Sequence, residues 1–596
     1  MHPPRPLDTR PIDPETPPSR GVGASPPSSP LDDPPPIRRR SAWNEACDIP
    51  TTMRSPLPAP FALLLAALFA ACSGQIAEPS GSDDPSRPGG GGGPGDPGDP
   101  SGPGGGPLGL SLGDDLDLYS RHTRSEYRYL LADLLVGADP TLRGEAWRTV
   151  EDFPENGYVG YYRHYAMVNA GTRLASQQLA LARALAAAFV TSDLYRELCS
   201  GARCAENVAD ELLPLIWRRP LEADERAELI AFHAELPAKV RDEAFFTRLF
   251  ASPWFHFEVF PPSPATDRDR ARKRAHLLAL ALRGSYPDDA LMEALEAGEL
   301  DDADADWEPH VRRLLESYPD RFAVLFLPQW LGMASLYEEG TPFHEVSMRT
   351  VMTEPALIFA SLVEDGDQPV TRLFALERNV VNGQLADLYG VDTGTAEWTP
   401  AEATRTLFGT AAMTVMFTDE ETGFPNPIRR GAYIVNRLLC RSIQFPSSEV
   451  QSEIDRVLEE VPEGLSPPER MAWLRENPTC ASCHEQFDHH GLALEEIGPL
   501  GETMETYYTG DPVVARGSVG ELDYESSVDF VAQLGATDEL HTCFAAQVHS
   551  YFSGGDPVDA RQRLQSGAAG AFHGVPAKEV VVEMALLAFE GEETDR

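Results

Sequence analysis

The chain has 596 residues, with 93 acidic and 49 basic side chains and a formal net charge of −44. This charge argues against binding to nucleic acid and against direct adhesion to an anionic lipid surface. It suits solubility outside the cell and a basic partner, although a generally acidic proteome explains it equally well. Roughly 480 residues follow the N-terminal low-complexity part, which is enough for three or four domains.

The N-terminal part has the features of an export signal. Residues 1–52 are rich in Pro, Ser, Arg and Asp without hydrophobic periodicity, and this composition is typical of disorder. The apolar run Phe61–Ala71 has the length of a signal-peptide core and falls short of the roughly 20 residues that span a bilayer. We therefore expect residues 53–71 to be a signal peptide that starts at Met53. Residues 1–52 are then an extension upstream of the true start codon, or a disordered segment.

Residues 68–71, just before Cys72, resemble a bacterial lipobox, a motif in which the cysteine is lipidated. Phe69 is a mild departure from it, and an ordinary secretory signal with a chance cysteine is the alternative. Residues 72–113 are rich in Gly and Pro, cannot bury a core and behave as a tether. We expect an exported protein with an N-terminal lipid anchor at Cys72, in the periplasm or on the cell surface. Ser73 favours the outer membrane.

The body that follows is expected to be mainly α. Helix-forming residues with apolar positions three and four apart predict helices at Thr172–Val190, Ala271–Arg283, Glu354–Glu364 and Arg430–Cys440. Strict alternation occurs only in short runs, around Gly517–Tyr524, so any sheet should be minor. The pattern favours a multidomain helical body with little sheet.

Cys480-Ala-Ser-Cys483-His484 has the spacing of a covalently attached c-type haem. The two thiols form thioethers with the porphyrin vinyl groups, and the adjacent imidazole ligates the iron from the proximal side. A CxxC redox pair is one alternative, but the expected strand-then-helix setting is missing. A zinc site completed by His489 and His490 is another. Because this motif attaches haem only outside the cytoplasm, the export signal favours one haem c as the cofactor.

The sixth iron ligand would decide the function. A Met or His there gives a low-spin electron carrier, whereas an open site permits peroxide or small-ligand chemistry. Met504, twenty residues past His484, is the candidate distal ligand. Further candidates, each more simply explained as a surface histidine or a packed methionine, are His489, His490, His541, His549, His573 and Met584. The neighbouring carboxylates are expected to be solvated: Glu485, Asp488, Glu495 and Glu496.

The remaining cysteines predict two disulfides. Of eight cysteines, Cys47 precedes the signal peptide, Cys72 takes lipid, and Cys480 and Cys483 take haem. Cys199 and Cys204 are close enough for a local disulfide in an oxidising compartment. Cys440 and Cys543 are left as a long-range pair that closes about 100 residues and stabilises by several kcal/mol on the chain-entropy model. Two free buried cysteines are the alternative for this second pair.

Short motifs along the body resemble those of a known family, in the same order. They are Arg121–Leu135, Trp217–Leu221, Ala251–Phe255, Tyr286–Leu291, Gln329–Gly332, Asn379–Tyr389, Pro427–Gly431 and Asn477–Glu495. The family is that of the multidomain planctomycete and myxobacterial cytochrome-like proteins, built from consecutive domains of unknown function (the 1587, 1595, 1592, 1588 and 1585 series). The resemblance implies a single-haem exported protein of undetermined activity. The chain departs from the family pattern at Ala281–Gly284 and at His489-His490.

These observations divide the chain into expected segments. They are an N-terminal helical domain at 114–190, a Cys-pair and Arg-Arg-Pro segment at 191–240, a central helical domain at 241–415, a haem-binding domain at 425–515 and a C-terminal helical domain at 516–596. The favoured function is electron transfer with a partner oxidoreductase. A haem peroxidase or oxidase with an open sixth site, and a cell-surface binding protein with structural haem, are the alternatives. No catalytic residue can be assigned.

Overall fold

The structure, a computed structural model, describes residues 119–153, 172–259, 266–333, 346–375, 378–393, 395–402, 406–419, 422–443, 448–568 and 572–590. All of them belong to one compact unit, Pro103–Arg596. The predicted signal peptide, Cys72, the tether and Cys47 lie outside the described residues. Helices make up 66% of the described part and strands 5%, which confirms the mainly α class.

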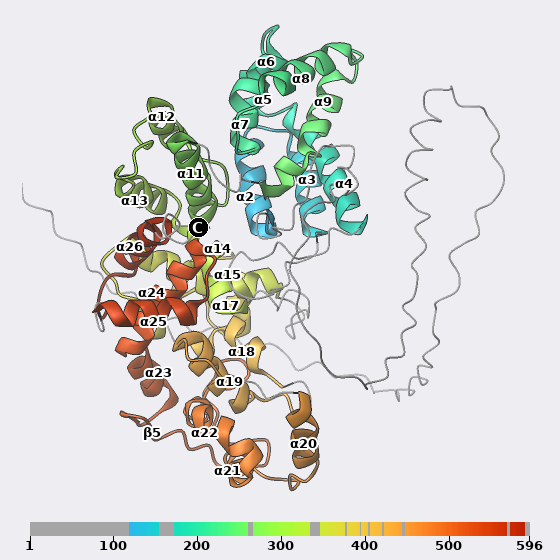
Figure 1. The fold of residues 1–596 in the computed structure, drawn as a ribbon. Helices are drawn as coiled ribbons and strands as arrows, with labels where there is room; N and C mark the ends of the chain where they lie inside the picture. Colours follow the sequence, from blue (N-terminus) through green and yellow to red (C-terminus); the bar gives the residue numbers. More distant parts are fainter. Residues whose placement is uncertain are drawn as a thin grey trace, which may run out of the picture. The chain divides into compact units, whose positions relative to one another are not determined.

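The first group of helices surrounds a core that is rich in phenylalanine. Phe189, Phe246 and Phe250 are fully buried there, and their ring centroids lie 4.7–6.1 Å apart. The elements, seen in blue and green in Figure 1, are β1 Tyr119–Arg121, α2 Arg124–Leu134, α3 Pro140–Glu151, α4 Thr172–Phe189, α5 Asp193–Cys199, α6 Cys204–Asn207, the π-helix η4 Val208–Leu212, α7 Leu213–Ile216, α8 Ala223–Glu235, α9 Arg241–Phe250, α10 Pro253–His256 and β2 Phe257–Val259.

The second group occupies the middle of the chain. Its elements are α11 Asp267–Arg283, α12 Asp289–Ala297, α13 Glu308–Ser317, α14 Pro319–Trp330, α15 Met348–Asp365, α16 Thr371–Phe374, β3 Arg378–Val381, α17 Gly383–Tyr389, β4 Thr399–Glu402, the 3-10 helix η6 Leu407–Gly409 and α18 Ala411–Phe417. The predicted helices at 271–283 and 354–364 correspond to parts of α11 and α15.

The third group carries the CASCH motif and the C-terminal helices. Its elements are α19 Pro427–Tyr433, the π-helix η7 Ile434–Leu438, α20 Ser448–Glu459, α21 Pro467–Glu476, α22 Pro478–Leu492, β5 Gly517–Val519, β6 Leu522–Tyr524, α23 Ser527–Gly535, α24 Asp538–Ser553, α25 Pro557–Ala568 and α26 Ala577–Glu590. β5 and β6 form an antiparallel pair at the place where the sequence predicts alternation, and β1–β2 and β3–β4 are the other described ladders.

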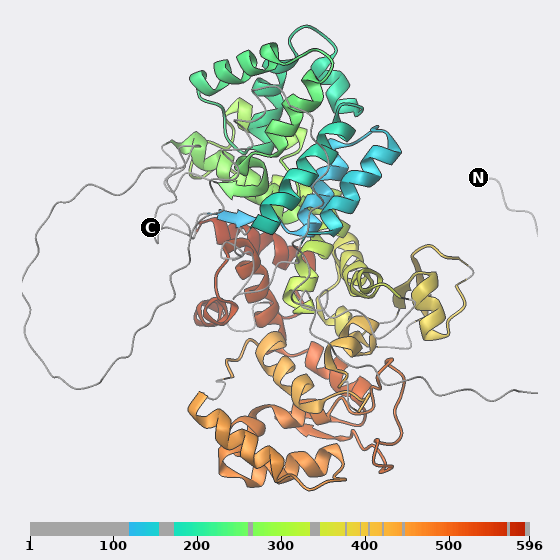
Figure 2. The same ribbon diagram turned by 90° about the vertical axis from the view of Figure 1, so that its right-hand side faces the viewer.

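The C-terminal helices complete the core of the middle group. Phe544 of α24 packs against Trp330 and Phe326 of α14, with ring centroids 5.1 and 6.3 Å apart. In Figure 2 the C-terminal helices, drawn in red, lie against the middle helices. Residues 271–589 therefore contribute to one continuous core. Residues 127–255 share the other large core. The segment bounds expected from the sequence stay a prediction.

A half-buried carboxylate links the first and middle groups. Asp133 of α2 accepts hydrogen bonds from Arg283 of α11 at 2.6 Å and from Arg321 of α14 at 2.8 Å. Arg283 is one of the residues at which the chain departs from the family pattern, and Gly284 ends α11 in the left-handed conformation. The departure therefore places a cation where it ties two helix groups together.

The described ranges contain no single helix that is long and apolar enough to cross a membrane. One bent pair, Arg173–Phe189 with Asp193–Cys199, meets that test by length and composition, with a bend of 73°.

Candidate functional site

The CASCH motif lies within α22, close to its first turn. Asn477 caps the helix by accepting a hydrogen bond from the Thr479 N–H at 2.9 Å, and Pro478 occupies the first helical position, where its missing N–H does no harm. α21 runs beside α22 (Figure 1), and α19 packs on it as well. Cys480, Cys483 and His484 therefore project from one continuous helix.

Two glycines let α19 and α22 approach closely. A Cβ atom on Gly431 would meet the carbonyl oxygen of Phe487, and a Cβ on Gly491 would meet that of Pro427, both far inside contact distance. Both glycines lie in motifs on which the family resemblance rests. Their role is to admit backbone-to-backbone contact, which fixes the position of the helix that bears the two thiols.

Apolar side chains surround both thiols. Cys480 is 5% exposed and belongs to a cluster with Val457 and Leu474. Cys483 packs against a cluster that contains Val435 and Phe487. Neither cysteine is disulfide-bonded. Burial, with a contribution from Cys483, raises the pKa of the Cys480 thiol. An attacking cysteine of a redox CxxC pair has a lowered pKa, so this environment disfavours the redox interpretation.

His484 is held by a buried carboxylate. Its Nδ1 lies 2.8 Å from Oδ1 of Asp488, one helical turn further on, and Arg475 of α21 donates to the other oxygen of Asp488 at 2.6 Å. Asp488 is fully buried. Metal-ligating histidines typically donate one ring N–H to a carboxylate, which sets the tautomer and orients the ring. The contact uses Nδ1 and thus leaves Nε2 as the nitrogen for a metal.

The donor set fits a c-type haem. Two thiols one helical turn apart, an adjacent imidazole held by a carboxylate, and an apolar lining are the features that such a group needs. Cys480 and Cys483 would form the thioethers and His484 would ligate the iron. A zinc site is less well supported, because the described ranges bring no third ligand atom of another Cys, His, Asp or Glu close to these thiols.

The other histidines of α22 face away from His484. His489 and His490 follow it by five and six residues, which places them about 120–140° around the helix. Both line a groove of about 290 Å³ between α22, Arg441 and the β5–β6 turn. Because His489 and His490 lie on another face of the same helix than His484, they are poorly placed to bind the same metal ion.

Met504 lies beyond the end of α22. Its backbone N–H donates to the Glu496 carbonyl at 2.8 Å. Glu496 itself lies four residues after Leu492, the last residue of the helix. His484 lies eight residues before Leu492, or about 12 Å along the helix axis. Met504 as a distal ligand therefore stays a prediction from the sequence, which no described contact supports.

The more distant candidates have other contacts. His541 is 2% exposed, with its ring nitrogens near Thr371 and the carbonyls of Phe572 and Gly535. His573 pairs with Asp538 at 2.7 Å, and Met584 is buried in the large core. Burial lowers the pKa of His549 to about 4. These contacts suit packed or paired side chains.

The expectation that all four neighbouring carboxylates are solvated is wrong for two of them. Asp488 is fully buried and Glu495 is 2% exposed. Burial raises the pKa of Glu495 to about 8, while the positive charge of Arg430 opposes this rise. Arg430 is itself fully buried and donates to the carbonyls of Leu494 and Ile497 at 2.9 and 2.8 Å. The i, i+4 spacing of His484 and Asp488 on one helix is the sequence signal that could have predicted their contact.

The structure joins the same two cysteine pairs that the sequence suggests. Cys199 is bonded to Cys204, and Cys440 is bonded to Cys543. The second bond connects the chain just after η7 to α24. It therefore covalently links the part that supports α22 with the C-terminal helices.

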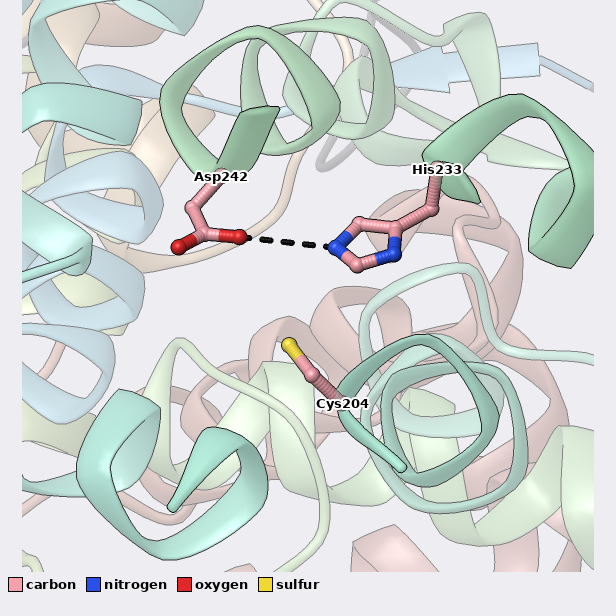
Figure 3. Close-up of side chains that lie close together, drawn as sticks. All are labelled: Cys204, His233 and Asp242. Carbon is pink, nitrogen blue, oxygen red and sulfur yellow. Dashed lines mark hydrogen bonds and ion pairs between the residues drawn. The ribbon is translucent and has the colours of Figure 1, made fainter. Parts of the chain in front are cut away.

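A second mixed group lies in the first helical core. Figure 3 shows Cys204, His233 and Asp242, contributed by α6, α8 and α9, with their side chains directed toward one another. One ligand atom from each lies within 4.8 Å of the others, and no further group in the described ranges does so. His233 and Asp242 are not among the candidate residues from the sequence, because nothing in their spacing pairs them with a cysteine.

Three of the family-like motifs meet in one buried polar cluster. Arg218 lies 3.2 Å from Nε2 of His122, and Tyr127 OH lies 2.9 Å from Nδ1 of His256. Arg218 also donates to the carbonyls of Trp254 and Phe257, both at 2.6 Å. Burial, with the nearby His122 and Arg218, lowers the pKa of His256 to about 3. Each histidine of the cluster is hydrogen-bonded at one ring nitrogen only, since the buried Nδ1 of His122 and Nε2 of His256 have no hydrogen-bond partner among the described residues.

Two family models, both described as proteins of unknown function, match parts of the chain. Residues 270–391 match PSD4, described as a protein of unknown function (DUF1592). Residues 406–507 match PSCyt3, described as a protein of unknown function (DUF1588). The two matches are consecutive and belong to the predicted series, so the resemblance is confirmed. The second contains α19–α22 and the CASCH motif. No curated protein and no solved structure matches the chain.

Proposed function

We propose that the chain is an exported, lipid-anchored, monohaem c-type cytochrome-like protein that exchanges electrons with a partner oxidoreductase. The observation that carries the proposal is the arrangement on α22, where Cys480, Cys483 and His484 share one helix and Asp488 holds the imidazole. The match of residues 406–507 to a cytochrome-like domain supports it.

The chain's own residues divide the work. Cys480 and Cys483 would attach the porphyrin, and His484 would ligate the iron through Nε2. Asp488 keeps the proton on Nδ1 of His484 and thereby orients the ring, while Arg475 balances the buried negative charge. Reversible one-electron oxidation of iron is the chemistry that the haem supplies when bound.

The location follows from the sequence. Cys72 carries the lipid anchor, residues 72–113 form the tether, and the outer membrane is the favoured site. The acidic body, with a formal charge of −44, suits a partner with a basic docking surface. Fractionation of the native cells, with lipid labelling of wild type and of Cys72→Ser, tests the anchor. Labelling that persists in Cys72→Ser contradicts it.

The direct test of the haem is a pyridine haemochrome spectrum of full-length protein made with c-type haem maturation machinery. We expect one covalent haem per chain in the wild type. Cys480→Ser combined with Cys483→Ser should abolish attachment, whereas His489→Gln, on another face of α22, should keep it. Wild-type protein without covalent haem, despite competent maturation, would overturn the proposal.

An open sixth position is a second candidate, and the placement of Met504 beyond the end of α22 favours it. In that case the protein is a peroxidase or oxidase. Spectra with and without carbon monoxide distinguish the two functions: low-spin haem that ignores the gas indicates an electron carrier, and high-spin haem that binds it indicates the enzyme. Met504→Leu should convert a low-spin spectrum to high-spin if this methionine is the ligand. If the haem exchanges electrons only slowly, the remaining function is that of a cell-surface binding protein with structural haem.

A further inference from the structure

The group of Cys204, His233 and Asp242 stands apart from α22, and the motifs of the family resemblance do not include His233 or Asp242 (Figure 3). The sulfur of Cys204, the imidazole and the carboxylate converge from α6, α8 and α9. The disulfide places a fourth potential ligand next to them, since Cys199, at the end of α5, is bonded to Cys204. Such a set is that of a tetrahedral zinc centre.

The distance between His233 and Asp242 suits metal ligands better than a hydrogen bond. Nε2 of His233 lies 3.4 Å from Oδ1 of Asp242. A normal hydrogen bond between such atoms is about 2.7–3.2 Å long. Zinc binds nitrogen at about 2.0–2.1 Å and carboxylate oxygen at about 2.0–2.2 Å, so two of its tetrahedral ligands stand about 3.3–3.5 Å apart. The two side chains already have the separation that a shared zinc ion requires.

The neighbours of the two side chains orient them. Tyr195 OH donates to Oδ2 of Asp242 at 2.8 Å, which leaves Oδ1 directed at His233. The ring of Phe245 packs edge-on against His233, with centroids 4.8 Å apart. Contacts of this kind fix metal ligands in known sites. The Asp242 side chain is 43% exposed, so an ion can enter from solvent.

We propose that reduction of the Cys199–Cys204 disulfide turns this group into a zinc site with Cys199, Cys204, His233 and Asp242 as ligands. In the oxidised chain both sulfurs are committed to each other and offer no thiolate. A dithiol reductant supplies two electrons and two protons, so that the S–S bond becomes two thiols and the reductant becomes a disulfide. Zinc then displaces the thiol protons to solvent.

The loop between the two cysteines permits this change. Cys199 ends α5 and Cys204 begins α6, with residues 200–203 between them. Two thiolates on one zinc ion, each about 2.3 Å from it, stand about 3.8 Å apart. Once the bond is broken, a small movement of this short loop reaches that separation. His233 and Asp242 can keep their present positions.

Zinc is the metal that this ligand set selects. Thiolate and imidazole together suit zinc, whereas calcium and magnesium require oxygen ligands throughout. The site is independent of the proposed haem, since its residues come from the first helical core. Metal binding here would report the redox state of the Cys199–Cys204 pair.

The test is metal titration of the full-length chain, reduced without oxygen by a trialkylphosphine. Cys480→Ser and Cys483→Ser are included throughout, so that the CASCH thiols bind no metal. Zinc is measured by competition with a chromophoric chelator, and cobalt serves as the spectroscopic probe of thiolate ligation. We expect one zinc ion per reduced chain, none per oxidised chain, and a tetrahedral cobalt–thiolate spectrum.

Variants separate ligands from bystanders. His233→Gln and Asp242→Asn should each weaken zinc binding by more than about 100-fold, and Tyr195→Phe, a positioning residue, by about 10- to 100-fold. His310→Gln replaces a half-buried histidine on another helix, and this variant should bind zinc as tightly as the parent chain with Cys480→Ser and Cys483→Ser. Circular dichroism establishes that each variant is folded. Equal zinc binding by His233→Gln and Asp242→Asn, tight binding by the oxidised chain, or none by the reduced chain would each overturn the site.

Discussion

Two regions of this molecule combine cysteine, histidine and aspartate, and they do so in opposite ways. On α22 the four residues Cys480, Cys483, His484 and Asp488 occupy successive turns of one helix. In the first core, Cys204, His233 and Asp242 come from three helices. The first arrangement is fixed by helical geometry alone, whereas the second exists only after those helices have packed. Local spacing therefore reveals one site and leaves the other hidden.

The two aspartates differ in the same sense. Asp488 is fully buried between His484 and Arg475. The Asp242 side chain is 43% exposed and receives one hydrogen bond from Tyr195. A buried, charge-balanced carboxylate suits a ligand that stays in place, and an exposed one suits an ion that arrives and leaves. The difference fits the two proposals, a permanently attached cofactor on α22 and a reversibly bound ion in the first core.

The largest expected effect comes from removing the two disulfides, Cys440–Cys543 and Cys199–Cys204. Cys440→Ser with Cys543→Ser opens a link across 103 residues and should lower the free energy of unfolding by about 4–5 kcal/mol. Cys199→Ser with Cys204→Ser opens one across 5 residues and should lower it by about 2 kcal/mol. Denaturant unfolding of both pairs, without added metal, gives the comparison. Equal losses would show that loop length does not set the stabilisation.

The next effect concerns the close approach of α19 to α22. Gly431→Ala or Gly491→Ala inserts a methyl group against a backbone carbonyl and should destabilise by about 1–3 kcal/mol as the helices move apart. Gly144→Ala is the matched control: it lies within α3, and its Cβ would meet nothing within 4 Å. That substitution should stabilise by about 0.5–1 kcal/mol. The same response at both places would refute the contact.

The third effect, which is spread over several pH units, is the pH dependence contributed by Glu495. Burial raises the pKa of Glu495 to about 8 in the folded chain, whereas an unfolded Glu titrates near 4.3. Between these values the folded state holds a proton that the unfolded state lacks, so stability falls as the pH rises, by about 1 kcal/mol per pH unit. The stability of Glu495→Gln, measured from pH 5 to 8, should lack this slope. A slope identical to that of the wild type would place the proton elsewhere.

The smallest effect tests the partner of His484. Asp488→Asn removes the negative charge from the Nδ1 hydrogen bond and makes the imidazole a weaker donor to iron. The midpoint potential of the loaded protein should rise, because the oxidised iron loses more stabilisation than the reduced iron. A redox titration measures the shift, with Glu485→Gln, an exposed position on the same helix, as the control. No difference between the two variants would remove Asp488 from the site.

Much of the fold could be predicted from the sequence. The helices predicted at Thr172–Val190 and Ala271–Arg283 appear as α4 and α11, and the alternation around Gly517–Tyr524 appears as the β5–β6 pair. These features depend on neighbours along the chain, to which propensity and periodicity apply directly. The CASCH motif could be recognised for the same reason, because its residues are neighbours along the chain.

Features that depend on packing between distant segments could not be predicted from the sequence. The burial of Asp488 and Glu495 escaped prediction because carboxylates are usually solvated, and because the arginines beside them, Arg475 and Arg430, reach them only through helix contacts. His233 and Asp242 lie on separate helices and show no shared pattern. α14 and α24 share one core although they are more than 200 residues apart, and only packing brings them together.

The bond between Cys440 and Cys543 also limits how this chain can be divided. Cys440 lies inside the segment that matches a family model, residues 406–507, and Cys543 lies outside it. A protease cut between the two would leave both fragments attached until a reductant is added. A chimaera that imports only 406–507 from a relative would bring one half of a cysteine pair. The smallest interchangeable module is therefore longer than the family match and must include α24.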